Sequence, residues 1–219
     1  CLMKAKTALE ATHYHLGVAS EGSFGPHPSI PFAPMAHELM VFLDLEHQWI
    51  ISEYILSQNT NYASLIVDKT TQIESFLNQV SFPSHALTLQ SYPNNAVIAK
   101  GILDRHALQE FLHFGFKRYP SLLLATDMRA MMNPTRMGVL AELADKLALR
   151  IATLCPQCKA PGFGFIKTQG ELPCEICLGP SSMYQSEVWS CIACPYQEIR
   201  NRQDGLTHSE PQYCHGCNP

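Results

Sequence analysis

Four Cys-x-x-Cys pairs constrain the fold of this chain more than any other feature. Eight of its nine cysteines lie in the last 65 of 219 residues. They form the pairs Cys155/Cys158, Cys174/Cys177, Cys191/Cys194 and Cys214/Cys217. Two-residue spacing lets both sulfurs of such a knuckle face one centre. The first two knuckles are separated by 15 residues and the last two by 19, and both separations are typical of zinc sites. The pattern predicts two structural zinc ions, each held by four cysteines.

The spacing leaves two ways of pairing the knuckles. Consecutive pairing gives two separate zinc ribbons, whereas alternate pairing, with Cys155/Cys158 and Cys191/Cys194 on one metal, gives a cross-braced unit. We favour consecutive pairing. Four protein ligands leave no open coordination position, so neither site is expected to be catalytic. We interpret His215, inside the last knuckle, as a neighbour of the metal and not as a ligand.

The first knuckle also has the form of a redox motif. Residues 155–158 read CPQC, a tetrapeptide of thioredoxin type. A reactive thiolate is favoured at a helix N-terminus, where the helix dipole stabilises negative charge. Here the motif follows the C-terminal end of a predicted helix, where the dipole opposes ionisation. A bound cation removes that difficulty, so zinc is the better interpretation.

Charge argues against nucleic acid as the favoured partner. The formal net charge is −4, and two zinc ions held by eight thiolates take it to about −8. From Cys155 onward, four Lys or Arg residues face six Asp or Glu residues. Four aromatic residues of this region are interpreted as the small core of the knuckles in preference to a base-stacking surface: Phe163, Phe165, Trp189 and Tyr196.

Composition predicts a globular, cytoplasmic protein. Hydrophobic residues make up 46% of the chain and charged residues 16%, and no apolar run reaches the roughly 20 residues needed to span a membrane. Dense cysteines in a reducing compartment indicate metal more often than disulfides. The chain begins within a helical pattern at Cys1 without a capping residue, so we expect a truncated amino terminus from which a strand is missing.

The rest of the chain predicts an α/β fold: a domain over residues 1–154 with a mixed central sheet and flanking helices, followed by the zinc-ribbon region over 155–219. We expect a strand that ends at Glu21, a loop over 21–34 rich in Gly and Pro, and a central strand over 121–126 that ends at Asp127. Asn133 caps the longest helix, which has Pro134 at its first position. The other expected elements are strands over 38–45, 49–57, 85–90 and 96–99, a helix over 70–80, and a helix from its Asp104 cap to 118.

Two polar loops follow apolar strands, at residues 21–28 and 126–136. If both strands run parallel in one open sheet, Glu21 and Asp127 lie at the same edge, where two carboxylates suit Mg²⁺. The second loop opens the long helix, whose free N–H groups favour an anion. We therefore predict Glu21 and Asp127 as catalytic metal ligands. The predicted anion-binding residues are Arg129, Arg136, Asn133, Ser23 and Lys100.

Each of these residues also has a structural interpretation. Asp127 caps a turn, Arg129 pairs with Glu21 in a buried bridge, and Arg136 lies on the solvent face of its helix. Five lesser candidates are expected by default in surface or turn roles: His27, Glu38, Lys100, Asn61 and Asp104.

The motifs resemble a known family. EGSFGPHP at 21–28, TDMRAMMNPTR at 126–136 and the knuckles CPQC, CEIC, CIAC and CHGC are similar to an uncharacterised bacterial family, domain of unknown function 6671, over essentially the whole chain. A fainter likeness links residues 4–23 (KAKTALEAT, LGVAS, EGS), FPSHALTL at 82–89 and KGILD at 100–104 to inosine triphosphate pyrophosphatases. That likeness implies a metal- and phosphate-binding loop at Glu21.

Two functional hypotheses follow. The first is a Mg²⁺-dependent hydrolase that acts on a nucleotide or another phosphate ester. The second is a non-catalytic zinc-ribbon module that recognises a protein, a nucleic acid or a small anionic ligand. Neither the substrate nor the oligomeric state follows from the sequence.

Overall fold

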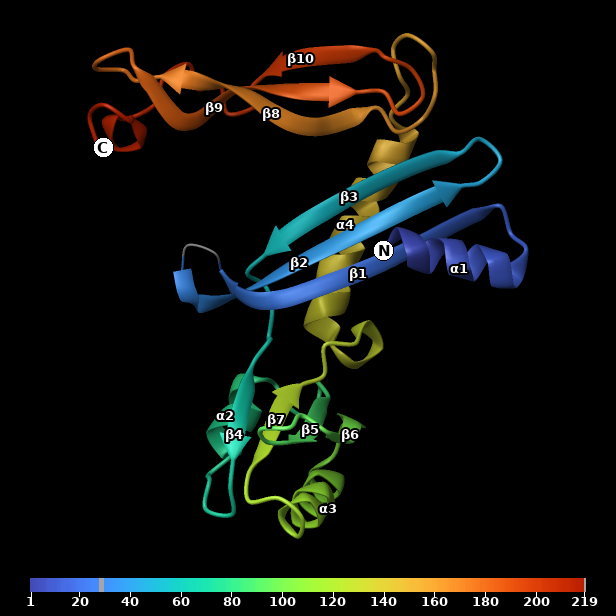
Figure 1. The fold of residues 1–219 in the computed structure, drawn as a ribbon, viewed down its shortest axis with the longest axis vertical. Helices are drawn as coiled ribbons and strands as arrows, with labels where there is room; N and C mark the ends of the chain where they lie inside the picture. Colours follow the sequence, from blue (N-terminus) through green and yellow to red (C-terminus); the bar gives the residue numbers. More distant parts are fainter. Residues whose placement is uncertain (28–29, 219) are drawn as a thin grey trace. The chain divides into compact units, whose positions relative to one another are not determined.

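The computed structural model describes residues 1–27 and 30–218, without the side chains of residues 27 and 30–33. The described part contains three sheets and four α-helices, which confirms the α/β class (Figure 1). The expected single central sheet is divided in two, and the third sheet carries the knuckles. Among residues 1–27 and 30–218, no helix combines the length and apolar character needed to cross a bilayer.

The first sheet has the order β1-β2-β3, with β1 at Leu16–His27, β2 at Ile30–Asp44 and β3 at Trp49–Ser57. Helix α1, Leu2–Thr12, precedes it. The predicted loop over 21–34 is wrong, because its described part continues β1 and β2. Proline is tolerated where a strand has a partner on one side only. β1 is an edge strand, and nine-residue β3 is too short to cover all fifteen residues of β2.

The second sheet has the order β4-β7-β5-β6 and only antiparallel neighbours. Its strands are β4 Ser64–Val67, β5 Leu87–Ser91, β6 Val97–Ile102 and β7 Leu122–Thr126. β7 is an inner strand, as predicted.

Helices α2 (Glu74–Gln79) and α3 (Arg105–Phe116) supply the core of this sheet with buried side chains such as Phe76 and Leu108. Asp104 caps α3 by accepting a hydrogen bond from the Ala107 N–H at 2.9 Å, as predicted. Gly115 allows α3 to approach β7 closely, since a Cβ there would lie 2.7 Å from Leu122.

The 3-10 helix η1, Ala130–Met132, leads into α4, Pro134–Ala152. The Asn133 side chain accepts a hydrogen bond from the Arg136 N–H at 3.0 Å, which confirms the predicted N-cap. After α4 come β8 (Gly164–Pro173), β9 (Pro180–Ser190), β10 (Gln197–Asn201) and the 3-10 helix η2 (Pro211–Tyr213). These three strands form an antiparallel sheet in the order β10-β9-β8.

The chain divides into two compact units that are not continuous in sequence. One comprises Cys1, Ala19–Met40 and Ser52–Asp145, and the other Leu2–Val18, Val41–Ile51 and Lys146–Pro219. The cysteine knuckles all belong to the second unit. The domain boundary expected between residues 154 and 155 stays a prediction.

Candidate metal centres

The sheet of β8, β9 and β10 carries the knuckles at its two ends. Cys155/Cys158 precede β8, Cys174/Cys177 join β8 to β9, Cys191/Cys194 join β9 to β10, and Cys214/Cys217 follow β10. Each strand therefore begins near one end of the sheet and leads toward the other (Figure 1).

This arrangement makes the expected consecutive pairing wrong. The four sulfurs of Cys155, Cys158, Cys191 and Cys194 form one cluster, called site 1 below. Those of Cys174, Cys177, Cys214 and Cys217 form a second cluster, called site 2. A ten-residue strand spans about 33 Å, so the 15 residues between the first two knuckles are used to reach the far end of the sheet. The region is one cross-braced unit in place of two ribbons.

The knuckles share a local backbone geometry. In three of them the residue after the second cysteine donates its N–H to the carbonyl of the first: Lys159 to Cys155, Leu178 to Cys174 and Asn218 to Cys214, each at 3.0 Å. Lys159 and Leu178 adopt positive φ angles of 61° and 59°, which β-carbon sterics disfavour. The turn bends the chain sharply enough for both sulfurs to face one point.

Backbone N–H groups also point at the sulfurs. Ala193 donates to the Cys191 sulfur at 3.2 Å, Ile176 to Cys174 at 3.4 Å, and Gly216 to Cys214 at 3.4 Å. Hydrogen bonds of this kind stabilise thiolate, the form of cysteine that binds metal.

The sulfur spacing fits zinc. Four sulfurs about 2.3 Å from a central ion lie about 3.8 Å from one another in a tetrahedron. The nearest contacts between knuckles are 3.5 and 3.8 Å in site 1 and 3.4 and 4.0 Å in site 2, and all sulfurs of a site lie within 4.8 Å. A disulfide would need about 2.05 Å, and all eight cysteines are free. The geometry therefore suits tetrahedral metal coordination.

The thiol pKa values are divided within site 1, with one lowered and one raised. Burial acts to raise the pKa of Cys155, but the backbone N–H groups of Cys158 and Gln157 help lower it to about 7. A backbone hydrogen bond at Tyr196 acts to lower the pKa of Cys194, yet burial and the neighbouring thiols raise it to about 12.

Site 2 has the same asymmetry. The backbone N–H groups of Cys217 and Gly216 lower the pKa of Cys214 to about 6, whereas its hydrogen bond with Cys177 first, and then other thiols, raise the pKa of Cys217 to about 12. Four sulfurs this close cannot all be thiolates without a central positive charge.

Aromatic residues support site 1. Phe163 is buried beside Cys155 and Cys191, and Trp49, Trp189 and Tyr196 pack against the same cluster. This supports the expected small core for three of the four aromatics; Phe165 is partly exposed. His215 is exposed and belongs to neither set of four sulfurs.

The polar loop at the start of α4 is held by internal ion pairs. Arg129 donates to both carboxylate oxygens of Asp127, its Nη2 at 2.6 Å from Oδ2, and the Gly101 N–H adds a bond at 3.0 Å. Burial acts to raise the pKa of Asp127, but these hydrogen bonds, chiefly those from Arg129, hold it below its usual value of 3.8. The expected Arg129–Glu21 pair is wrong, because Arg129 pairs with its sequence neighbour Asp127.

Arg136 forms a second ion pair, deeper in the fold. Its guanidinium donates to both oxygens of Glu38, at 2.7 and 3.0 Å, and to the Met128 carbonyl. Glu38 is fully buried and Arg136 is only 13% exposed. Phe24 covers the guanidinium at 5.1 Å. The expected solvent-facing Arg136 and surface or turn role for Glu38 are therefore wrong.

Gly22 explains part of the EGSFGPHP motif. A Cβ at this position would lie 2.5 Å from a Glu38 oxygen and 2.6 Å from Arg136 Nη2, so only glycine lets β1 pass the buried pair. Phe24 in turn stacks on Tyr62 at 6.1 Å. The described part of the motif thus encloses an ion pair.

The remaining candidates do not converge on one metal. Glu21 and Ser23 are exposed on β1, whereas Asp127 follows β7 in a different sheet, so the expected shared sheet edge is wrong. Lys100 is exposed on β6. Sites 1 and 2 are the only places in the described part of the chain where three or more His, Cys, Asp or Glu side chains lie close enough together to bind one metal ion. The catalytic role of Glu21 and Asp127 stays a prediction.

Two buried polar contacts fix the N-terminus of α4. Asn133 is fully buried, and its amide donates to the Asn61 side-chain oxygen at 2.7 Å. His85 Nε2 accepts the Thr135 N–H at 3.2 Å and contacts its hydroxyl at 2.9 Å. Sequence reasoning missed His85, because no motif relates residues 50 positions apart. The side chain of His27 and the position of Pro28 lie outside the described residues.

Together these features define a mixed α/β protein that ends in a cross-braced pair of four-cysteine clusters with metal-site geometry. The chain belongs to the family described as Domain of unknown function (DUF6671), whose match covers residues 4–219. This confirms the prediction made from the loops and knuckles. No curated protein and no solved structure matches the chain. The likeness to inosine triphosphate pyrophosphatases therefore has no support from these comparisons.

Proposed function

We propose that this protein is a zinc-stabilised, non-catalytic binding module, in which two structural zinc ions hold the sheet of β8, β9 and β10 for recognition of a protein partner. The observation that carries the proposal is the pair of four-sulfur clusters, with contacts of 3.4–4.0 Å between knuckles. When bound, zinc supplies the positive charge that neutralises four thiolates at each end of the sheet.

Site geometry favours a structural role over catalysis. Each cluster offers four protein ligands, which fills a tetrahedral zinc and leaves no position for water or substrate. The chain's own residues therefore position and cross-link strands. The role of the metal is to replace the large core that a three-stranded sheet of this size lacks.

The charges of the knuckle region favour protein over nucleic acid. Arg200 pairs with Glu198 and lies 4.0 Å over the Trp189 ring, and Arg202 pairs with Asp204. These cations are engaged within the chain, whereas phosphate contacts require accessible ones. Exposed apolar side chains at both ends of the unit provide the contact area that protein partners use: Ile166, Ile176, Leu178, Ile199 and Tyr213.

The hydrolase alternative has less support. Two of its predicted anion-binding residues, Arg129 and Arg136, already bind carboxylates at 2.6–3.0 Å. An anion would have to displace Asp127 or Glu38, and the second of these is fully buried. The geometry favours Arg129, and not Mg²⁺, as the partner of Asp127.

Metal analysis of the purified full chain tests the proposal. We expect two zinc ions per chain, and their removal by a chelator should unfold the knuckle region. A chain that folds fully and stably without metal would overturn the structural role. Release of phosphate or pyrophosphate from a nucleotide panel with Mg²⁺, abolished by Asp127→Asn, would overturn the non-catalytic one.

A further inference from the structure

The two metal sites differ in how well the protein covers them. In site 1, Cys155 and Cys191 are buried, Cys194 is half-buried and Cys158 is exposed. Phe163, 1% exposed, fills the space beside these ligands, and its ring lies 5.8 Å from Tyr196 and 6.2 Å from Trp189. Aromatic cover of this kind limits the approach of water and solutes to the metal.

Site 2 is more open. Cys177 and Cys217 are both exposed, so two of its four ligands are accessible to solvent. The apolar residues of its CEICL knuckle turn outward: Ile176 is 70% exposed and Leu178 is 69% exposed. The loop from Arg202 to Glu210, which brings the last knuckle back to the site, contains no helix or strand.

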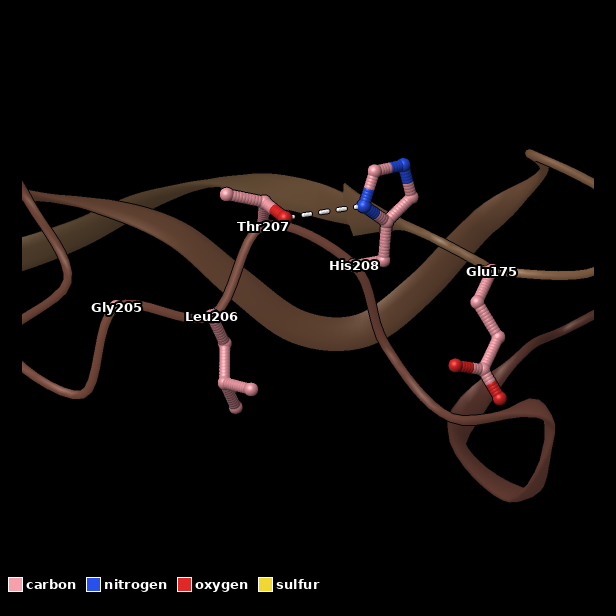
Figure 2. Close-up of a pocket in the computed structure, with 5 residues that line it drawn as sticks. All are labelled: Glu175, Gly205, Leu206, Thr207 and His208. Atoms are coloured by element: carbon pink, nitrogen blue, oxygen red, sulfur yellow. Dashed lines mark hydrogen bonds between the residues drawn. The ribbon is translucent and has the colours of Figure 1, made fainter.

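A hollow opens beside this site. It has a volume of about 420 Å³ and is lined by Glu175, Gly205, Leu206, Thr207 and His208. Figure 2 shows Glu175 and His208 among the side chains that line it, with Thr207 hydrogen-bonded to the His208 ring at 3.1 Å. Glu175 directly follows the ligand Cys174, so the hollow lies next to one knuckle of site 2.

The sulfurs of site 2 are also placed to react with one another. Cys177 lies 3.4 Å from Cys214, close to the 3.5 Å between Cys158 and Cys191 in site 1, so the two sites differ in access and not in sulfur spacing. Cys177 is exposed and Cys214 is 1% exposed. An accessible thiolate beside a sheltered one is the arrangement of an attacking and a resolving cysteine.

We propose that site 2 is a peroxide-oxidisable zinc–thiolate site, whereas site 1 keeps its metal under the same conditions. The Cys177 sulfur attacks one oxygen of a hydroperoxide, forming an S–O bond as the O–O bond breaks and the leaving oxygen takes a proton. The Cys214 thiolate then attacks the Cys177 sulfur, forming the disulfide as hydroxide leaves and takes a second proton. This inference rests on the proposed zinc binding.

The electrons balance in these two steps. Two thiolates lose two electrons in forming one disulfide, and the hydroperoxide gains both; hydrogen peroxide yields two waters. Only Cys174 and Cys217 then remain as ligands, so Zn²⁺ leaves and the two remaining thiolates take up protons. A dithiol reductant with added zinc reverses the change.

A time course of the oxidation of the zinc-loaded full chain by hydrogen peroxide tests the proposal. A chromophoric chelator measures the zinc released, and tryptophan fluorescence reports on site 1, since both tryptophans of the chain, Trp49 and Trp189, pack against it. We expect one zinc per chain to leave with unchanged fluorescence and a Cys177–Cys214 disulfide in peptide mass mapping. The second zinc should leave at least about tenfold more slowly, with a fluorescence change.

Matched variants separate the sites. Cys158→Ser removes the exposed ligand of site 1 and should keep the fast phase and the disulfide, whereas Cys177→Ser should lose both. If a variant fails to fold, the two phases of zinc release from the parent chain still test the proposal. Both zinc ions leaving together, or a first release accompanied by the fluorescence change, would overturn the proposal. A purified chain without zinc would instead refute the proposed function.

Discussion

The loop that opens α4 and the cysteine region deal with charge in opposite ways. Around the loop, each carboxylate that reaches the interior meets an arginine: Asp127 meets Arg129, and Glu38 meets Arg136. In the cysteine region, eight thiols gather in two clusters of four sulfurs each. One region neutralises its charges within the chain, whereas in the proposed function the other takes its cation from outside. Stability of the first should therefore depend on side chains and that of the second on metal.

The largest expected effect is the loss of metal. Structural zinc contributes about 10–16 kcal/mol to the folding of small zinc domains, far more than any single side chain here. A strong chelator should unfold the surroundings of Trp49 and Trp189 and so change their fluorescence, while the core around Leu87 and Leu124 stays folded. Circular dichroism and fluorescence melting, with and without chelator, measure both responses. A single unchanged melting transition in the metal-free protein would show that the cysteine region does not depend on metal for its stability.

The next effect is the loss of Glu38. Glu38→Ala leaves the 13%-exposed Arg136 guanidinium without its carboxylate, and an unpaired buried charge costs about 3–5 kcal/mol. Denaturant unfolding measures the free energy change. Glu74→Ala serves as the matched control, because the Glu74–Arg105 pair is exposed on both sides. Similar destabilisation by the two substitutions would mean that Glu38 and Arg136 do not form a buried pair in solution.

Asp127→Asn should have a smaller effect with a distinctive pH dependence. The substitution weakens the charge-assisted hydrogen bonds from Arg129 and should cost about 1–3 kcal/mol near neutral pH. Because the folded-state pKa of Asp127 is lowered, its contribution is complete above the ordinary value of 3.8 and is lost as pH falls through the folded value. Stability curves of the parent and variant should therefore converge at low pH. A constant difference down to the acid transition would contradict this.

The smallest effect is expected at the helix cap. Asn133→Ala removes the acceptor of the Arg136 N–H and should cost about 1 kcal/mol, or somewhat more because the Asn61 side-chain oxygen also loses its hydrogen-bond donor. Thermal melting of the parent chain and of Asn133→Ala measures the effect. Asn133→Ala should melt below the parent, and equal melting points would show that the cap contributes nothing.

The sequence predicted local features well and long-range ones poorly. Local apolar patterns predicted the inner strand β7 and the hairpin of β2 and β3. Local capping signals predicted the helix caps Asp104 and Asn133. The Glu38–Arg136 pair joins residues 98 positions apart, and nothing local distinguishes it from two surface charges. The same limit applies to the knuckles. Their chemistry is local, but their pairing depends on strands that carry successive knuckles to opposite ends of a sheet.

Zinc content of two double-cysteine variants tests the cross-braced arrangement most directly. In Cys158→Ser/Cys194→Ser both substitutions fall in site 1, and in Cys177→Ser/Cys194→Ser they fall in different sites. The account predicts one retained zinc per chain for the first variant and none for the second. Consecutive pairing predicts that each of these variants loses both sites, so a first variant without zinc would contradict the account.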